Sequence, residues 1–196
     1  MDIKQLAVEA SQNSQAFGTL YDLLYARVYN YIRYRCNDQA TAEDLAAQTF
    51  ERLLGAIGSY DAGRGPFEPW LFTITRNVVT SHHRARALRS WLPWEWVQRQ
   101  ADPAPQPEEV ALLRESESAL LAALRKLKPQ ARDLLGLKYG SGLSNPQIAA
   151  LTGLSEGNVA VILHRAVEAL RRILEPGQPA VDLTPGCVKE AEHAGK

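Results

Sequence analysis

The sequence predicts an all-α fold of two small helical domains joined by a Pro-rich linker. Apolar residues recur near a spacing of 3.6 along both halves of the chain, as amphipathic helices require. Between the halves, residues 101–107 hold three prolines in seven positions, which cannot continue a helix. The chain has 196 residues, of which 45% are hydrophobic, and this is enough for two small domains that each have a packed core. The predicted boundaries are 1–98, a linker at 99–108, 109–175, and a disordered tail at 176–196.

Three helices are predicted in the first half, over residues 16–34, 42–57 and about 67–88. The first carries a broad apolar face that begins at Phe17 and Leu20. The second has one apolar face and one charged face. Residues 60–66 between the second and third helices are rich in Gly, Asp and Pro, which is typical of a loop. The apolar face of the second helix comprises Leu45, Ala46, Thr49, Phe50, Leu53 and Ile57, and that of the third comprises Leu71, Ile74, Thr75 and Val78.

The second half predicts helices at 107–127, 129–139, 145–152 and 155–174, and the last two have the layout of a helix-turn-helix. Ser144 is followed three residues later by Gln147, as a capping box requires. Gly153 ends that helix and Ser155 opens the next. Two short helices across a glycine-containing turn can place the second one in a DNA major groove.

Composition argues against several other classes of protein. No apolar run approaches twenty residues, and the N-terminus lacks the layout of a signal peptide, so a cytoplasmic protein without membrane insertion is expected. Cys36 and Cys187 are far apart and form no CxxC pair, and His82 and His83 have no partner at ligand spacing. We therefore predict no disulfide, metal or cofactor. No phosphate loop, HExxH motif or catalytic triad is present, so an enzyme is not expected.

Charge is unevenly distributed along a chain whose net charge is zero. Residues 64–99 contain six arginines and two acids, a local balance of +4, so the remainder sums to −4. The positive charge of such a block is complementary to a phosphate backbone, although an ordinary solvent-exposed helix face would have the same composition. Three tryptophans between residues 91 and 96 predict a patch that folds back on the first domain or meets a partner.

With both halves in view, the chain resembles the sigma-70 family, and within it the extracytoplasmic-function (ECF) class that keeps only region 2 and region 4. The resemblance rests on the order and spacing of short motifs. In the first half these are Ala42-Glu43-Asp44-Leu45, Phe50-Glu51-Arg52-Leu53 and the run Trp70 to Asn77. In the second half they are Leu124-x-x-Leu127, Arg132, Gln147-Ile148-Ala149, Gly157-Asn158-Val159 and Arg165-Ala166.

The resemblance implies a transcription initiation factor that binds bacterial core RNA polymerase and promoter DNA, and it also implies an anti-sigma factor as a partner. The helix at 42–57 would dock on polymerase through a polar rim around apolar anchors. The loop and helix from residue 60 would hold the melted minus-ten strand with ring faces, an amide and cations. The helix at 155–170 would read the minus-thirty-five element in the major groove.

Candidate residues follow from these three roles. Polymerase binding is assigned to Asp44, Gln48, Phe50, Arg52 and Leu53. Minus-ten recognition and melting are assigned to Tyr60, Arg64, Phe67, Trp70, Arg76, Asn77, Arg84 and Arg86, with core packing an even alternative for Trp70. Minus-thirty-five recognition is assigned to Ser155, Asn158, Ala160, Val161, His164 and Arg165.

The sequence departs from the family pattern at two places. The usual Gln-Glu pair of the docking helix reads Ala47-Gln48, so one acid is missing. Ala160 and Val161 stand where the family often has a basic and a small hydroxyl residue, so His164 and Arg165 would carry most hydrogen-bond readout. The competing interpretation is a stand-alone helix-turn-helix regulator that binds duplex DNA without polymerase, and it leaves the segment from residue 42 to 89 without a role.

Overall fold

A computed structural model describes residues 2–36, 38–89 and 109–175, and within these ranges every regular element is helical, which confirms the all-α prediction. Side chains are described for the same ranges except 89 and 109–116. The predicted linker, the tryptophan patch and the tail lie outside the described residues. In chain order the elements are α1 (Ile3–Ala10), α2 (Ser14–Arg35), α3 (Gln39–Ala56), η1 (Ile57–Ser59), α4 (Phe67–Arg89), α5 (Glu109–Arg125), α6 (Pro129–Leu135), η3 (Gly136–Gly140), α7 (Asn145–Thr152) and α8 (Glu156–Leu174).

Short polar side chains fix where several helices begin. The Asn13 carboxamide oxygen accepts from the backbone N–H of Gln15 at the start of α2, and the Asp38 carboxylate accepts from that of Thr41 in α3. Each of these acceptors satisfies a backbone donor that the first turn of a helix leaves without a partner. The predicted starts at residues 16 and 42 were therefore late by two or three residues.

Helix α1 was not predicted. Asp2 caps it by accepting a hydrogen bond from the Lys4 N–H, and Leu6, Ala7 and Ala10 are buried on one face. The spacing of these three residues fits one face of a short helix, but eight residues give too little periodicity to separate a helix from a loop. The helix packs mainly on α2.

The first half of the chain is a bundle of α2, α3 and α4. The predicted apolar face of α3 is buried throughout, from Leu45 to Ile57. On α4, Leu71, Thr75 and Val78 are buried as predicted, and Ile74 is half-buried. The hydroxyls of Thr49 and Thr75 each donate to the carbonyl four residues earlier, so both polar groups are satisfied inside the core.

The helix-turn-helix has the predicted geometry. Ser144 and Gln147 form the reciprocal capping box, and Gly153 ends α7 in the left-handed region with φ of 74°. Only glycine adopts that conformation without a steric penalty from Cβ. The helix predicted at 129–139 is divided, because η3 continues α6 as a π-helical turn from Gly136 to Gly140.

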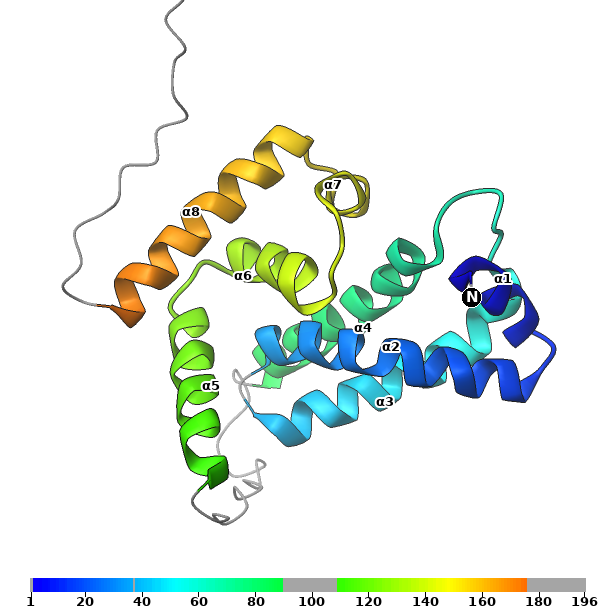
Figure 1. The fold of residues 1–196 in the computed structure, drawn as a ribbon, viewed down its shortest axis with the longest axis horizontal. Helices are drawn as coiled ribbons and strands as arrows, with labels where there is room; N and C mark the ends of the chain where they lie inside the picture. The colour runs from blue at the N-terminus through cyan, green and yellow to red at the C-terminus, as the bar shows by residue number, and fades with distance from the viewer. Residues whose placement is uncertain (1, 37, 90–108, 176–196) are drawn as a thin grey trace, which may run out of the picture.

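The two halves lie against each other (Figure 1). Helix α2 contacts η3 and α6, and the α4 helix contacts α7. Buried side chains of both halves form a single apolar cluster, which joins Leu20 and Phe72 to Leu134 and Ile148. Helix α8 lies on the outer side of the second half, away from α2 and α3 (Figure 1).

Candidate nucleic-acid interface

Helix α8 presents one face to solvent along the segment predicted to read DNA. All six residues assigned to minus-thirty-five recognition are exposed. The opposite face is buried through Val159, Leu163 and Ala166. Ser155 starts the helix by accepting a hydrogen bond from the Asn158 N–H. The exposed face of α8 is therefore accessible to a partner, as insertion of a helix into a DNA groove requires.

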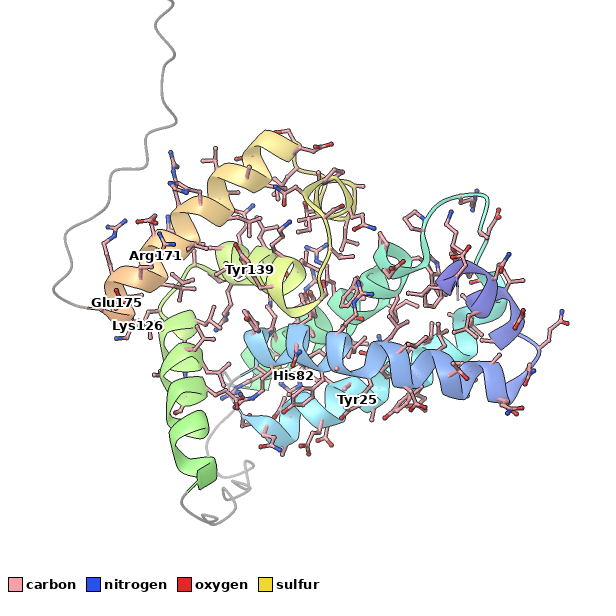
Figure 2. All side chains as sticks on the ribbon, in the orientation of Figure 1. Tyr25, His82, Lys126, Tyr139, Arg171 and Glu175 are labelled. Atoms are coloured by element: carbon pink, nitrogen blue, oxygen red, sulfur yellow. The ribbon has the colours of Figure 1, made fainter. Side chains whose placement is uncertain are left out.

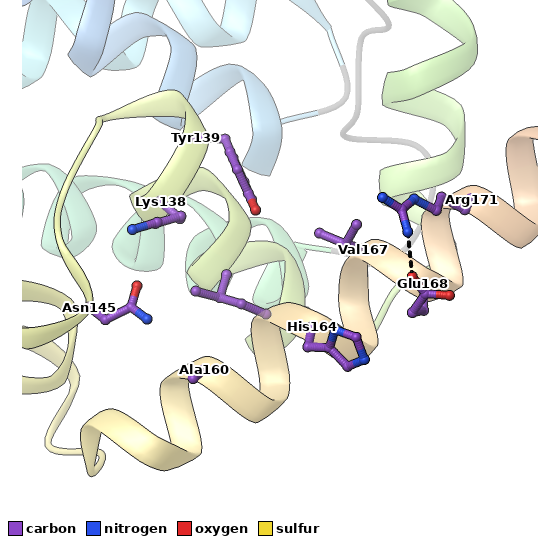
Figure 3. Close-up of a pocket in the computed structure, with 9 residues that line it drawn as sticks. Lys138, Tyr139, Asn145, Ala160, His164, Val167, Glu168 and Arg171 are labelled. Carbon is purple, nitrogen blue, oxygen red and sulfur yellow. Dashed lines mark hydrogen bonds and ion pairs between the residues drawn. The ribbon is translucent and has the colours of Figure 1, made fainter. Parts of the chain in front are cut away.

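A shallow hollow of about 310 Å³ lies beside this exposed face, between η3 and α8 (Figure 3). Arg171 and Glu168 form an ion pair of 2.7 Å at one end, and Tyr139 stands 59% exposed at the rim. The hollow is open to solvent, so it continues the exposed face of α8 rather than forming a separate enclosed site. Its lining comprises Lys138, Tyr139, Asn145, Ala160, Leu163, His164, Val167, Glu168 and Arg171.

Three aromatic rings assigned to the melted strand form one cluster. The ring centroids of Tyr60 and Trp70 lie 5.3 Å apart, and Phe67 lies 5.0 Å from Tyr60 and 5.6 Å from Trp70. Phe67 is fully buried, so in this structure it cannot offer a face to a base and instead supports the other two rings. Tyr60 and Trp70 are half-buried. The Tyr60 hydroxyl donates to the Gly65 carbonyl at 2.9 Å, which closes the loop between η1 and α4.

The cations assigned to the minus-ten strand differ in their accessibility. Arg64, Arg84 and Arg86 are exposed, as is the Asn77 carboxamide. Arg76 is half-buried and already occupied by contacts with the second half of the chain. The structure therefore leaves three of the four assigned arginines open to a phosphate backbone.

On α3, the polar residues assigned to polymerase binding are exposed and the apolar ones are not. Asp44, Gln48 and Arg52 lie at the surface. Leu53 is fully buried and Phe50 is 5% exposed, because both lie on the face that packs in the bundle. The expectation that these two would act as surface anchors is therefore corrected.

A stripe of tyrosines on α2, which sequence reasoning did not assign to a surface role, covers Phe50. Tyr21 lies 4.5 Å and Tyr25 6.2 Å from Phe50 between ring centroids, and Tyr29 stacks on Tyr25 at 6.1 Å. Figure 2 labels Tyr25 at the boundary between α2 and α3. The spacing of four residues from one tyrosine to the next was the available signal, because it places all three on one helix face.

A second missed feature is the buried carboxylate of Asp133 on α6, which is 8% exposed. It accepts a hydrogen bond of 2.7 Å from the Tyr31 hydroxyl and forms ion pairs with Arg35 at 3.0 Å and Arg76 at 2.9 Å. Burial, followed by the charge of Asp133, holds the pKa of Tyr31 well above its ordinary value of 10.0. An aspartate within an apolar helical run was the only sequence signal, and it did not identify partners up to 102 residues away.

Near the C-terminal ends of α2 and α4, arginines surround the half-buried imidazole of His83 and the buried thiol of Cys36. Burial lowers the pKa of His83 from 6.5 to about 4, with Arg35, His82, Arg132 and Arg86 adding to the shift. Burial also raises the pKa of the Cys36 thiol from 9.0 to about 11. Both groups are therefore uncharged at neutral pH.

We predict that His83 makes the fold sensitive to acid. Between pH 6.5 and 4 an unfolded chain takes up a proton at His83 that the folded chain does not, so the free energy of unfolding falls as the pH falls. Above pH 6.5 the imidazole is neutral in both states and contributes no pH dependence. Thermal denaturation at several pH values should show a smaller acid-induced loss for His83→Gln than for the unaltered protein. If the melting temperatures of the two proteins fell equally as the pH is lowered, His83 would not be the source of the acid sensitivity.

Within the described ranges, no group of three His, Cys, Asp or Glu side chains is arranged to hold a metal ion. The same ranges contain no helix that is long and apolar enough to cross a membrane.

Comparison with known proteins identifies both halves. Residues 20–89 match the family model of sigma-70 region 2, and residues 117–170 match that of sigma-70 region 4. The ECF RNA polymerase sigma factor BldN of Streptomyces coelicolor is 37% identical over 85% of this chain, and the aligned part spans 64% of BldN, less than two thirds of its length. The RNA polymerase sigma factor CarQ of Myxococcus xanthus is 32% identical over 81% of this chain and 89% of CarQ.

A solved structure shares the fold. The sigma factor RpoE of Bartonella quintana, in complex with the anti-sigma factor NepR, matches with a TM-score of 0.63 and 22% identity. The match covers 83% of this chain and 98% of that structure.

Proposed function

Because the chain belongs to the ECF class of the sigma-70 family, we propose that it binds bacterial core RNA polymerase, recognises promoter DNA and helps to melt it. It thereby initiates transcription of a specific gene set, in the cytoplasm, where polymerase and chromosome meet. The observation that supports this most is the exposed face of α8, whose six candidate residues are accessible while the back of the helix is buried. The chemistry of RNA synthesis belongs to the polymerase, so no catalytic residue is assigned.

At the minus-thirty-five element, α8 would lie in the major groove. Arg165 and His164 would donate hydrogen bonds to base edges, and Val161 would contact a thymine methyl group. Ala160 adds no polar contact, so direct readout rests on few side chains. Phosphate contacts and DNA shape would supply the remainder of the discrimination.

At the minus-ten element, the melted strand would cross the outer side of the Tyr60–Trp70 cluster and the cations of α4. Stacking of bases on aromatic rings is sequence-tolerant and favourable by about 1–3 kcal/mol per base. Asn77 offers both a donor and an acceptor for base recognition. Phe67 contributes by holding the two accessible rings in place.

For the polymerase, the exposed side chains Asp44, Gln48 and Arg52 lie on α3, and the tyrosine stripe of α2 lies beside them. Aromatic residues among polar ones are the composition typical of interface hot spots. The stripe replaces the buried Phe50 and Leu53 as the source of apolar contact area. An anti-sigma factor, such as the NepR seen with RpoE, would compete for faces of this kind.

Run-off transcription with purified protein, sigma-free bacterial core polymerase and fragments of its own genome tests the proposal. Transcripts that begin at discrete sites only when the protein is present would support it and would locate the promoter elements. Absence of transcripts, together with failure to co-elute with core polymerase, would contradict it and favour the stand-alone regulator.

A further inference from the structure

Four buried nitrogen atoms near the C-terminal ends of α2 and α4 have no hydrogen-bond partner among the described residues. They are Nη1 of Arg33, Nε of Arg35, Nε of Arg132 and Nε2 of His83. Buried polar atoms of this kind are rare in proteins, because the loss of their contact with water is not compensated. We call these four residues the basic cluster.

The four side chains of the basic cluster come from three helices that meet at one place. Helix α2 ends beside the start of α6 (Figure 1), where Arg35 donates to the Pro129 carbonyl at 3.3 Å. Arg132 follows Pro129 by three residues, so the two lie on the same side of α6. Burial is the largest cause of the lowered pKa of His83 on α4, and the charges of Arg35 and Arg132 add to it. The cluster is therefore one site rather than four separate positions.

The carboxylates beside the basic cluster neutralise it only in part. Asp133 lies 3.0 Å from Arg35, but it also pairs with Arg76 at 2.9 Å, so one negative charge serves two arginines. Glu117 lies 3.6 Å from Arg33, and its side chain is 54% exposed, so water weakens the attraction between them. An excess of positive charge remains at the cluster.

Arg132 is the member of the cluster that the electrostatics of the helices does not explain. The C-terminal end of the α2 dipole favours Arg33 and Arg35, which lie in the last turn of that helix. Arg132 lies instead in the first turn of the helical segment that runs from Pro129 through η3, where the dipole disfavours a cation. Burial, and then the charge of Arg35, hold the pKa of the Arg132 guanidinium below its ordinary value. An anion bound beside Arg132 would remove this unfavourable energy.

We propose that the basic cluster is a binding site for the phosphate group of a small molecule. Guanidinium groups bind phosphate oxygens through paired N–H donors in a planar fork. A terminal phosphate group offers three acceptor oxygens and a charge of about −1.5 to −2 at neutral pH, so one such group serves several donors at once. The side chains of Arg33 and Arg35 are only 17% and 13% exposed, which favours a terminal phosphate over a DNA phosphate that continues into a chain on both sides.

The test uses inorganic phosphate and pyrophosphate as probes on the full-length protein, without polymerase or DNA. Isothermal titration calorimetry gives the affinity. Thermal denaturation in phosphate, and in potassium chloride of equal ionic strength, separates binding from screening. Arg132→Met and Arg33→Met each remove a guanidinium and keep an unbranched apolar side chain. Arg172→Met is the matched control, because Arg172 is exposed on α8 and does not belong to the cluster.

We expect saturable binding of at least one probe, and a higher melting temperature in phosphate than in chloride. Both cluster variants should bind at least about tenfold more weakly, as the loss of a charged hydrogen bond predicts, whereas Arg172→Met should bind like the unaltered protein. The order of stability should also reverse between the two salts. Arg132→Met should be at least as stable as the unaltered protein in chloride and less stable in saturating phosphate, because the charge of Arg132 is unfavourable only without a bound anion.

Equal melting temperatures of the unaltered protein in phosphate and chloride would overturn the site, as would an equal loss of affinity in Arg172→Met. A lower stability of Arg132→Met in chloride would show that a group of the protein itself neutralises Arg132, and it would overturn the site too. Undiminished affinity in a folded Arg33→Met variant would have the same consequence. The sigma-factor function is decided separately by run-off transcription, because none of these measurements involves polymerase or promoter.

Discussion

Full-length protein with both His164 and Arg165 replaced by alanine should lose promoter-directed run-off transcription by on the order of 100-fold. These two residues are the hydrogen-bonding groups at the centre of the exposed α8 face, and their neighbours Ala160 and Val161 are apolar. A good side-chain contact to a base edge contributes about 1–3 kcal/mol of discrimination, so two such contacts account for a loss of this size. The fold should be unaffected, because both side chains are exposed.

Arg172→Ala is the matched control for that experiment. Arg172 is exposed on the same helix about two turns beyond Arg165, so the variant removes one positive charge while all six assigned residues are kept. Its effect on transcription should be less than a few-fold and should diminish further as salt is raised. Equal losses in the two variants would mean that α8 attracts DNA by charge alone and does not read bases.

Replacing Phe67 by alanine should lower the free energy of unfolding by about 3–5 kcal/mol, the usual cost of deleting a buried aromatic ring. Phe67 is fully buried and contacts both Tyr60 and Trp70, so its removal leaves a cavity below the two rings. Denaturant titration followed by circular dichroism measures the loss. Phe67→Leu, which keeps most of the volume, should cost less than half as much.

Trp70→Ala distinguishes the two roles within the same cluster. Trp70 is half-buried, so the variant removes less packing but takes away an accessible ring face. It should be more stable than Phe67→Ala and yet more defective in opening the promoter. A stable Phe67→Ala variant with a selective opening defect would instead return Phe67 to the role that the sequence alone suggested.

Local signals in the sequence were sufficient to predict where the two helices of the helix-turn-helix begin and end. Ser144, Gln147, Gly153 and Ser155 define the ends of α7 and α8 through contacts no more than four residues apart. Such contacts are determined by residue types at fixed offsets, so they can be read before the fold is known. The exposed face of α8 then followed from its periodicity.

Features that depend on tertiary packing could not be read in this way. Phe67 and Tyr60 are both aromatic residues beside a loop, yet only the first is fully buried. Phe50 and Leu53 belong to the face that periodicity assigned to the core, and their second assignment as surface anchors came from a family pattern rather than from an exposed position. The partners of Asp133 lie 57 to 102 residues away, a distance that no local rule spans.

The buried thiol of Cys36 has a consequence for oxidative stress. Oxidants such as peroxide attack the thiolate, and a pKa near 11 keeps almost all of this side chain protonated at the pH of a cell. Burial adds a steric barrier to glutathione and other bulky disulfides. Any response of this protein to the redox state of the cell must therefore come from a partner or from another part of the chain, and Cys36 remains a packing residue throughout.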